Sequence, residues 1–168
     1  MMMRAVLLLV LLCYAPASSF AAETDEKDIR AVIESFRTAI LQKDKPRFLG
    51  LFVSADVPWQ GVLTDDGLAE LRHLDSKAVK VAFDHRSTAA AFIESIARNK
   101  KSSEQKFTNI KVDTDGDVAT ATADYDFLSG DRIVNSGKEC WLLVRGGAGW
   151  KITTLAFSSN LKRDEAKH

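Results

Sequence analysis

The sequence predicts an α+β fold in which helices come first and an antiparallel sheet comes last. In the first half of the chain, apolar residues recur every three or four positions, as on one face of a helix. From Glu104 onward the period shortens to two, which is typical of strands. Short turns rich in glycine and aspartate separate these later segments, so neighbouring strands should run antiparallel. This order favours helices packed on one face of a sheet.

The composition is that of an ordinary globular domain. The 168 residues include 23 Lys and Arg and 23 Asp and Glu, with 46% apolar residues. This balance argues against intrinsic disorder, which needs low hydrophobicity and high net charge. It also argues against a nucleic-acid partner, because no excess of basic residues is present to neutralise phosphates.

The first residues predict a secretory signal peptide. Met1–Arg4 is a short basic start, Val6–Tyr14 is an apolar run, and small residues follow. Such a run is too short to cross a bilayer, which needs roughly 20 residues. We expect cleavage after Ala21 and export of the mature chain, periplasmic or secreted, with no membrane attachment. Cleavage after Ser19 or Ala22 and an uncleaved anchor are the alternatives.

The remaining sequence predicts one domain. The signal peptide takes residues 1–21, the domain residues 22–161, and a charged tail residues 162–168. The mature chain keeps one cysteine, Cys140, so it cannot form an internal disulfide. Because Cys140 lies in an apolar strand, we interpret it as a small hydrophobic residue, with a reactive thiol as the alternative.

The helices are predicted from caps and apolar stripes. Thr24 and Asp25 can cap a first helix, in which an apolar stripe runs from Ile29 to Leu41. Asp44 can cap a short second helix that begins at Pro46. The less regular middle of the chain predicts, in order, a strand at Val57–Leu63, a helix at Leu68–His73 capped by Asp66, a weak strand at Val79–Phe83 and a helix from Ser87 to about Asn99.

Four strands then complete the predicted fold. They cover Phe107–Asp113, Val118–Phe127, Lys138–Arg145 and Trp150–Ser158. In the second of them, Ala119, Ala121 and Ala123 share a face with Tyr125 and Phe127. Small alanines let helices approach closely, whereas the rings would fill or line a wider end. A strongly bent sheet would therefore enclose a hollow that can hold a small molecule.

Several segments, in this order and spacing, carry a resemblance that covers nearly all of the mature chain. They are Pro46–Leu49, Trp59–Val62, Glu104–Ile110, Asp115–Thr120, Gly137–Trp141 and Gly149–Ile152. The chain resembles the nuclear transport factor 2-like superfamily in its SnoaL-like branch, and more closely its exported bacterial members of unassigned function. The resemblance implies an α+β cone, also called cystatin-like, that is often homodimeric.

The resemblance does not imply a reaction, because the superfamily includes isomerases, dehydratases, cyclases, binding proteins and silent scaffolds. Its steroid isomerases use an aspartate base that aligns near Gln60, and glutamine cannot take a proton at neutral pH. Isomerase chemistry of that kind is therefore not expected.

Two mid-strand carboxylates, Glu139 and Asp124, are the candidate acid/base residues. Each could instead face outward or pair with a lysine on a neighbouring strand. If Glu139 and Trp141 share the concave face with Tyr125, they form a polar and aromatic pocket wall. The predicted ligand-binding residues are Trp59, Phe83, Tyr125, Phe127, Glu139 and Trp141.

No cofactor or metal is predicted. The three histidines, His73, His85 and His168, do not show the spacing of metal ligands. Asp113–Asp117 and Gly146–Gly149 are better interpreted as hairpin turns than as calcium or phosphate sites. Three functions stay open: binding of a small, largely apolar molecule by a homodimer, a cofactor-free lyase, isomerase or hydrolase, and a non-catalytic accessory module with a filled cone.

Overall fold

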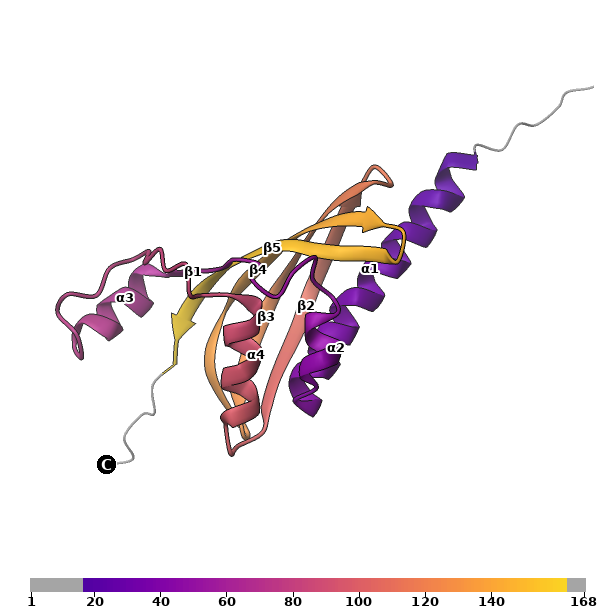
Figure 1. Ribbon diagram of the computed structural model, residues 1–168. Helices are drawn as coiled ribbons and strands as arrows, with labels where there is room; N and C mark the ends of the chain where they lie inside the picture. Colours follow the sequence, from indigo (N-terminus) through magenta and orange to yellow (C-terminus); the bar gives the residue numbers. More distant parts are fainter. Residues whose placement is uncertain (1–16, 163–168) are drawn as a thin grey trace, which may run out of the picture.

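The computed structural model describes residues 17–162, with side chains from residue 23 onward (Figure 1). Its elements are α1 (Ala17–Gln42), α2 (Lys45–Leu49), β1 (Trp59–Leu63), α3 (Asp65–Arg72), α4 (Ala89–Arg98), β2 (Ser103–Thr114), β3 (Val118–Ser129), β4 (Arg132–Gly146) and β5 (Gly149–Leu161). The predicted order of helices followed by an antiparallel meander is confirmed. Within residues 17–162, no helix combines the length and hydrophobicity needed to cross a membrane.

The five strands form one open, curved sheet in the order β1-β5-β4-β3-β2. The last four strands are antiparallel neighbours, whereas β1 pairs in parallel with β5. The short strand β1 therefore lies at an edge, where Pro58 immediately before it removes no ladder hydrogen bond.

The curvature is strengthened by irregularities in the ladders. The β2–β3 register shifts between Thr108 and Lys111, where Asn109 has a φ of 52°. Further shifts follow Phe127 in β3 and Leu142 in β4. A bulge adds a residue to one strand, which bends it and increases its twist. The sheet thus curves around the helices rather than lying flat.

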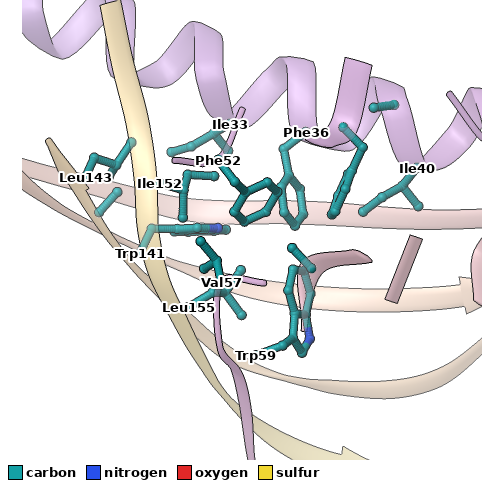
Figure 2. Close-up of a cluster of buried hydrophobic side chains, with 14 of the residues drawn as sticks. Ile33, Phe36, Ile40, Phe52, Val57, Trp59, Trp141, Leu143, Ile152 and Leu155 are labelled. Atoms are coloured by element: carbon teal, nitrogen blue, oxygen red, sulfur yellow. The ribbon is translucent and has the colours of Figure 1, made fainter. Parts of the chain in front are cut away.

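The core lies between α1 and the concave face of the sheet. Ile33, Phe36 and Ile40 of α1 point toward that face, and Figure 2 shows them opposite residues of β4 and β5. Ala119, Ala121 and Ala123 are all buried on β3, as their alternation predicts. Helix α1 lies closest to β2, and the small alanines leave room beside it for large rings such as those of Phe36 and Trp141.

Several predicted boundaries and caps are wrong. The helix α1 starts earlier than a cap at Thr24 or Asp25 would allow. The Asp25 carboxylate is buried and pairs instead with Arg145, 2.7 Å away. The caps of α3 and α4 are Thr64 and Thr88, whose hydroxyls accept backbone N–H bonds, rather than Asp66 and Ser87.

Two further predictions fail in the middle of the chain and on β4. Val79–Phe83 forms no strand, although its carbonyls at Lys80 and Ala82 accept bonds from β1 residues. Cys140 is exposed on the convex face, because it follows the inward-facing Glu139 in an alternating strand. The predicted signal peptide and charged tail lie outside the described residues, apart from residues 17–21 and Lys162.

Candidate ligand-binding site

Residues from β3, β4 and their neighbours meet in rows at the wide end of the concave face. Read across the sheet, the rows are Gln105–Phe127–Asn135, Phe107–Tyr125–Gly137 and Ala123–Glu139–Phe157–Gly61. Residues two positions apart on a strand point to the same face. The register therefore brings polar and aromatic side chains together beyond the alanine-rich half of β3.

Side chains from each of these rows, together with Trp59 and Phe92, line a cavity of about 110 Å³. Its aromatic walls are Trp59, Phe92, Tyr125, Phe127 and Phe157, and its polar walls are Gln105, Asn135 and Glu139. Phe92 comes from α4 and stacks on Trp59 of β1 with ring centroids 4.3 Å apart. The cavity is thus closed by helix α4 on one side and by the sheet on the other.

Glu139 is the central polar group of this cavity. Its side chain is only 1% exposed, and the amide nitrogen of Gln105 donates a hydrogen bond to Oε2. Burial raises the pKa of the Glu139 carboxyl well above its usual range, and the bond from Gln105 offsets only part of that effect. The carboxyl is therefore protonated at pH values where exposed glutamates are ionised.

The neutral carboxyl has one oxygen without a partner. Because Oε2 already accepts from Gln105, we assign the proton to Oε1, which has no hydrogen-bond partner. The Oδ1 atom of Asn135, four residues earlier on β4, is also buried without a partner. A buried polar group left unpaired costs about 1–3 kcal/mol. The cavity thus offers an unused donor and an unused acceptor.

Tyr125 shapes the cavity but has no free proton to offer. Its hydroxyl crosses β4 and donates to the Ser158 carbonyl oxygen, at 2.9 Å. Gly137 makes this arrangement possible, since a Cβ there would lie 2.0 Å from the same oxygen. Burial raises the pKa of the Tyr125 hydroxyl. Tyr125 therefore stays neutral, with its proton held by the backbone.

Comparison with known proteins places the fold. No family model and no curated protein sequence matches the chain. Among solved structures, a candidate scytalone dehydratase from Novosphingobium aromaticivorans aligns with a TM-score of 0.62 and 11% identity, over 89% of this chain and 93% of that one. A cystatin-like protein of the same organism, described as nuclear transport factor 2-like, aligns at 0.61 and 16%, over 89% and 90%. This chain has the nuclear transport factor 2-like fold.

A third structure with this nuclear transport factor 2-like fold is a candidate dehydratase from Streptomyces avermitilis. It aligns with a TM-score of 0.58 and 19% identity, over 84% of this chain and 99% of that one. Identities this low support the fold and leave the chemistry to the residues of each protein.

Four of the predicted binding residues meet at the wide end of the nuclear transport factor 2-like cone. Trp59, Tyr125, Phe127 and Glu139 all line the cavity. Glu139 and Trp141 share the concave face with Tyr125, which the sequence had left open. All three residues are buried on the side of the sheet that the helices cover.

Two predicted binding residues lie elsewhere. Trp141 is 2% exposed and packs against Phe36 and Phe107 in the narrow half of the cone (Figure 2), because it pairs with Ala121. Phe83 is 87% exposed in the loop before α4 and does not line the cavity. No strand forms at Phe83 to turn its ring inward.

Asp124 faces the opposite side of the sheet from Glu139. Its carboxylate is 2.6 Å from the Lys138 ammonium and accepts a bond from Asn109, at 2.7 Å. The hydrogen bond from Lys138, followed by that from Asn109, holds the pKa of Asp124 below its usual range. The outward-facing alternative is therefore correct for Asp124, and Glu139 is the one acid of the pair in the cavity.

Sequence reasoning missed four lining residues of the cavity: Phe92, Gln105, Asn135 and Phe157. Gln105 shares strand parity with Phe107, but the predicted strand began two residues too late to include it. Asn135 preceded the predicted start of β4 by three residues. In the described part of the chain, no three His, Cys, Asp or Glu side chains lie together as a metal site would need.

Proposed function

We propose that the mature chain is an exported protein that binds a small, largely apolar molecule in this cavity. One observation carries the proposal: Glu139 is a buried, neutral acid whose Oε1 has no partner, surrounded by aromatic side chains. A ligand oxygen that accepts this proton would satisfy the group. Such sites combine apolar walls with a few convergent polar groups.

The size of the cavity limits the ligand. Its volume is about 110 Å³, whereas a dry cavity of about 150 Å³ accommodates benzene. The head group is therefore no larger than one small ring, and even such a ring requires a small movement of a wall side chain. Phenol has the matching chemistry, because its oxygen can accept from Glu139 and its hydroxyl can donate to the Oδ1 atom of Asn135.

Titration calorimetry with phenol tests this proposal. We expect binding to the mature protein and a loss of roughly twofold to tenfold in affinity for Glu139→Leu, the effect of one hydrogen bond. Asp124→Asn is the matched control, because Asp124 is a carboxylate on the other face. Equal phenol affinities for wild type and Glu139→Leu would contradict the proposed role of Glu139.

The pH dependence gives a second readout. Phenol stays neutral below about pH 9, as a tyrosine side chain with a pKa of about 10 does. Wild-type affinity should fall when Glu139 ionises, since a carboxylate cannot donate. Glu139→Gln keeps an N–H donor at every pH, so its affinity should stay flat. A wild-type affinity that rises with pH, relative to Glu139→Gln, would refute donation by Glu139.

The alternative is a cofactor-free lyase, isomerase or hydrolase in which Glu139 acts as a general acid. Two of the similar structures carry dehydratase names, which supports this alternative at the level of the fold. Glu139 and Tyr125 are the titratable residues among the described lining, and the Tyr125 proton is engaged with Ser158. An elimination needs a base as well as an acid. The lack of a second free titratable group in this lining favours binding.

A filled, purely structural cone is less consistent with the cavity, which would have to collapse or hold water. The accessory role predicts that no phenol binds to the wild type or to Glu139→Leu. Phenol calorimetry therefore separates the two roles.

Export and pairing are also proposals. N-terminal sequencing of the exported protein should give Ala22 as the first residue if the signal peptide is cleaved after Ala21. A homodimer would use the uncovered convex face, where Thr122, Cys140 and Ala156 form one uncharged row and Leu142 is 38% exposed beside it. Sedimentation should give a particle with twice the mass of one chain. The Leu142→Lys variant should sediment with the mass of a single chain.

A further inference from the structure

A second hollow begins where the cavity ends. It is a groove of about 570 Å³ between the concave side of β1 and β5, helix α3 and the loop that follows it. In Figure 1, α3 and this loop project beyond the rest of the molecule, next to β1. Trp59 and Phe157 line both the groove and the cavity, so the two hollows share a wall.

The shared wall is a single layer of rings. The Phe157 ring lies 6.3 Å from Trp59 and 6.3 Å from Tyr125, in edge-to-face contact with both. Its far edge rests on Gly61, where a Cβ would come within 2.9 Å of the ring. The position of the partition therefore depends on a glycine in β1.

The groove is apolar at its base and charged at its rim. Leu63, Leu71 and Ala78 supply apolar lining from β1, α3 and the loop. Two of the charged side chains that line it are already paired, since Lys80 bonds to Asp65 and Asp84 to Arg86, at 2.6 and 2.9 Å. An uncharged, extended group is the occupant that this lining favours.

We infer that cavity and groove form one continuous site for an elongated amphipathic molecule, with its polar head at Glu139 and an alkyl tail that passes Phe157 into the groove. The inference rests on the proposed function, because the head group must bind in the cavity. It adds the class of ligand: a ring with a hydroxyl or carbonyl oxygen and an unbranched apolar chain. The inference is based on the cavity, the groove and the thin layer of rings that separates them.

The test is a series of 4-alkylphenols from phenol to 4-hexylphenol, titrated into the mature protein by calorimetry. A cavity of about 110 Å³ has no room for the longer chains. If the tail enters the groove, affinity should rise by about fourfold for each methylene that becomes buried. If the groove does not take part, affinity should stop rising, or fall, after the shortest chains.

Two variants block the groove without touching the cavity. Leu71→Trp fills it from α3, and Val79→Trp fills it from the loop, where Val79 is 55% exposed and a tryptophan should not disturb folding. Both should abolish the gain with chain length and leave phenol affinity unchanged. Leu41→Trp is the matched control, because Leu41 is 43% exposed on α1 and lines neither hollow.

The outcomes separate this inference from the proposed function. Binding of phenol with no gain for longer chains would overturn the extended site and leave the cavity proposal intact. A gain that survives in both blocking variants would also overturn it, since the tail would then lie elsewhere. Failure of phenol and of every alkylphenol to bind would refute the proposed function together with the extension.

Discussion

The concave face has a narrow half, around Ala121 and Trp141, and a wide half, around Tyr125 and Glu139. Both halves are built from the same strands, but the first is packed with side chains and the second contains a cavity. In the narrow half, Ala121 and Trp141 are paired neighbours packed beneath Phe36 of α1. In the wide half, only a few residues further along each strand, Tyr125 and Glu139 line a cavity. The narrow half is filled by side chains of the apolar core, with the indole N–H of Trp141 left unpaired, whereas the wide half leaves the Glu139 and Asn135 oxygens unpaired beside a cavity.

The difference shows how one sheet can separate stability from binding. The small alanines on β3 leave room for the large buried rings that pack between α1 and the sheet in the narrow half. Beyond Ala123 the side chains become large on the sheet, and α4 replaces α1 as the cover. Substitutions in the narrow half should therefore affect stability most, whereas those in the wide half should affect binding or its pH dependence.

The largest effect is expected for Phe36→Ala in the narrow half. Phe36 is 0% exposed and contacts five aromatic rings, including a stacked Trp59. Its removal should lower the free energy of unfolding by about 3–5 kcal/mol, measured by urea denaturation. Leu41→Ala on the same helix should change it by less than about 0.5 kcal/mol. If both variants lost a similar amount of unfolding free energy, the packing of the narrow half would not be what stabilises the fold.

Gly137→Ala should have the next largest effect, and it tests how tightly the wide half is built. A Cβ at Gly137 would lie 2.0 Å from the Ser158 carbonyl oxygen, so the two strands must move apart. Overpacking of this kind costs about 1–3 kcal/mol in the free energy of unfolding. Gly147→Ala is the control, because no atom lies within 4 Å of its added Cβ. A Gly137→Ala variant as stable as the control would mean that the wide half tolerates expansion.

The fold could be predicted from the sequence because its signals are local. Alternation in β3 identified the buried face from Ala119 to Tyr125, and Asp44 was correctly expected as the cap of α2. These features depend on periods of two and 3.6 residues, which a single chain carries in full. For Glu139 the sequence left both faces of the sheet open, and the structure places it on the concave side.

The composition of the site could not be predicted in the same way, because it depends on strand register. Trp141 and Glu139 have the same parity, yet pairing with Ala121 takes Trp141 to the narrow half. Gln105 and Asn135 meet only because both pair with Phe127. Val79, Val81 and Phe83 alternate as in a strand, so the sequence did not indicate that the ring of Phe83 lies in solvent.

Glu139→Gln, in the wide half, should have a smaller effect on the free energy of unfolding, and this effect should depend on pH. The folded state holds the Glu139 proton, whereas the unfolded state releases it above about pH 4.5. Wild-type stability should therefore fall, relative to Glu139→Gln, by about 1.4 kcal/mol per pH unit above that point, until the folded carboxyl ionises. Below about pH 4.5, the difference in the free energy of unfolding between the two proteins should be constant. Urea denaturation of both proteins across pH measures this, and parallel curves would show that Glu139 is not held neutral.

The smallest effect is expected for Asp124→Asn, on the convex side of the same strands. Its carboxylate pairs with Lys138 in contact with solvent, where water and salt screen the attraction. The hydrogen-bonded pair lowers the pKa of Asp124, so its small contribution to stability is present above the ordinary aspartate pKa and is lost as the pH falls through the lowered value. The contribution of Asp124 to stability thus increases with pH, whereas the contribution of Glu139 decreases. A denaturation midpoint that moves more for Asp124→Asn than for Gly137→Ala would show that the outer face, and not the packed interior, controls the stability of the sheet.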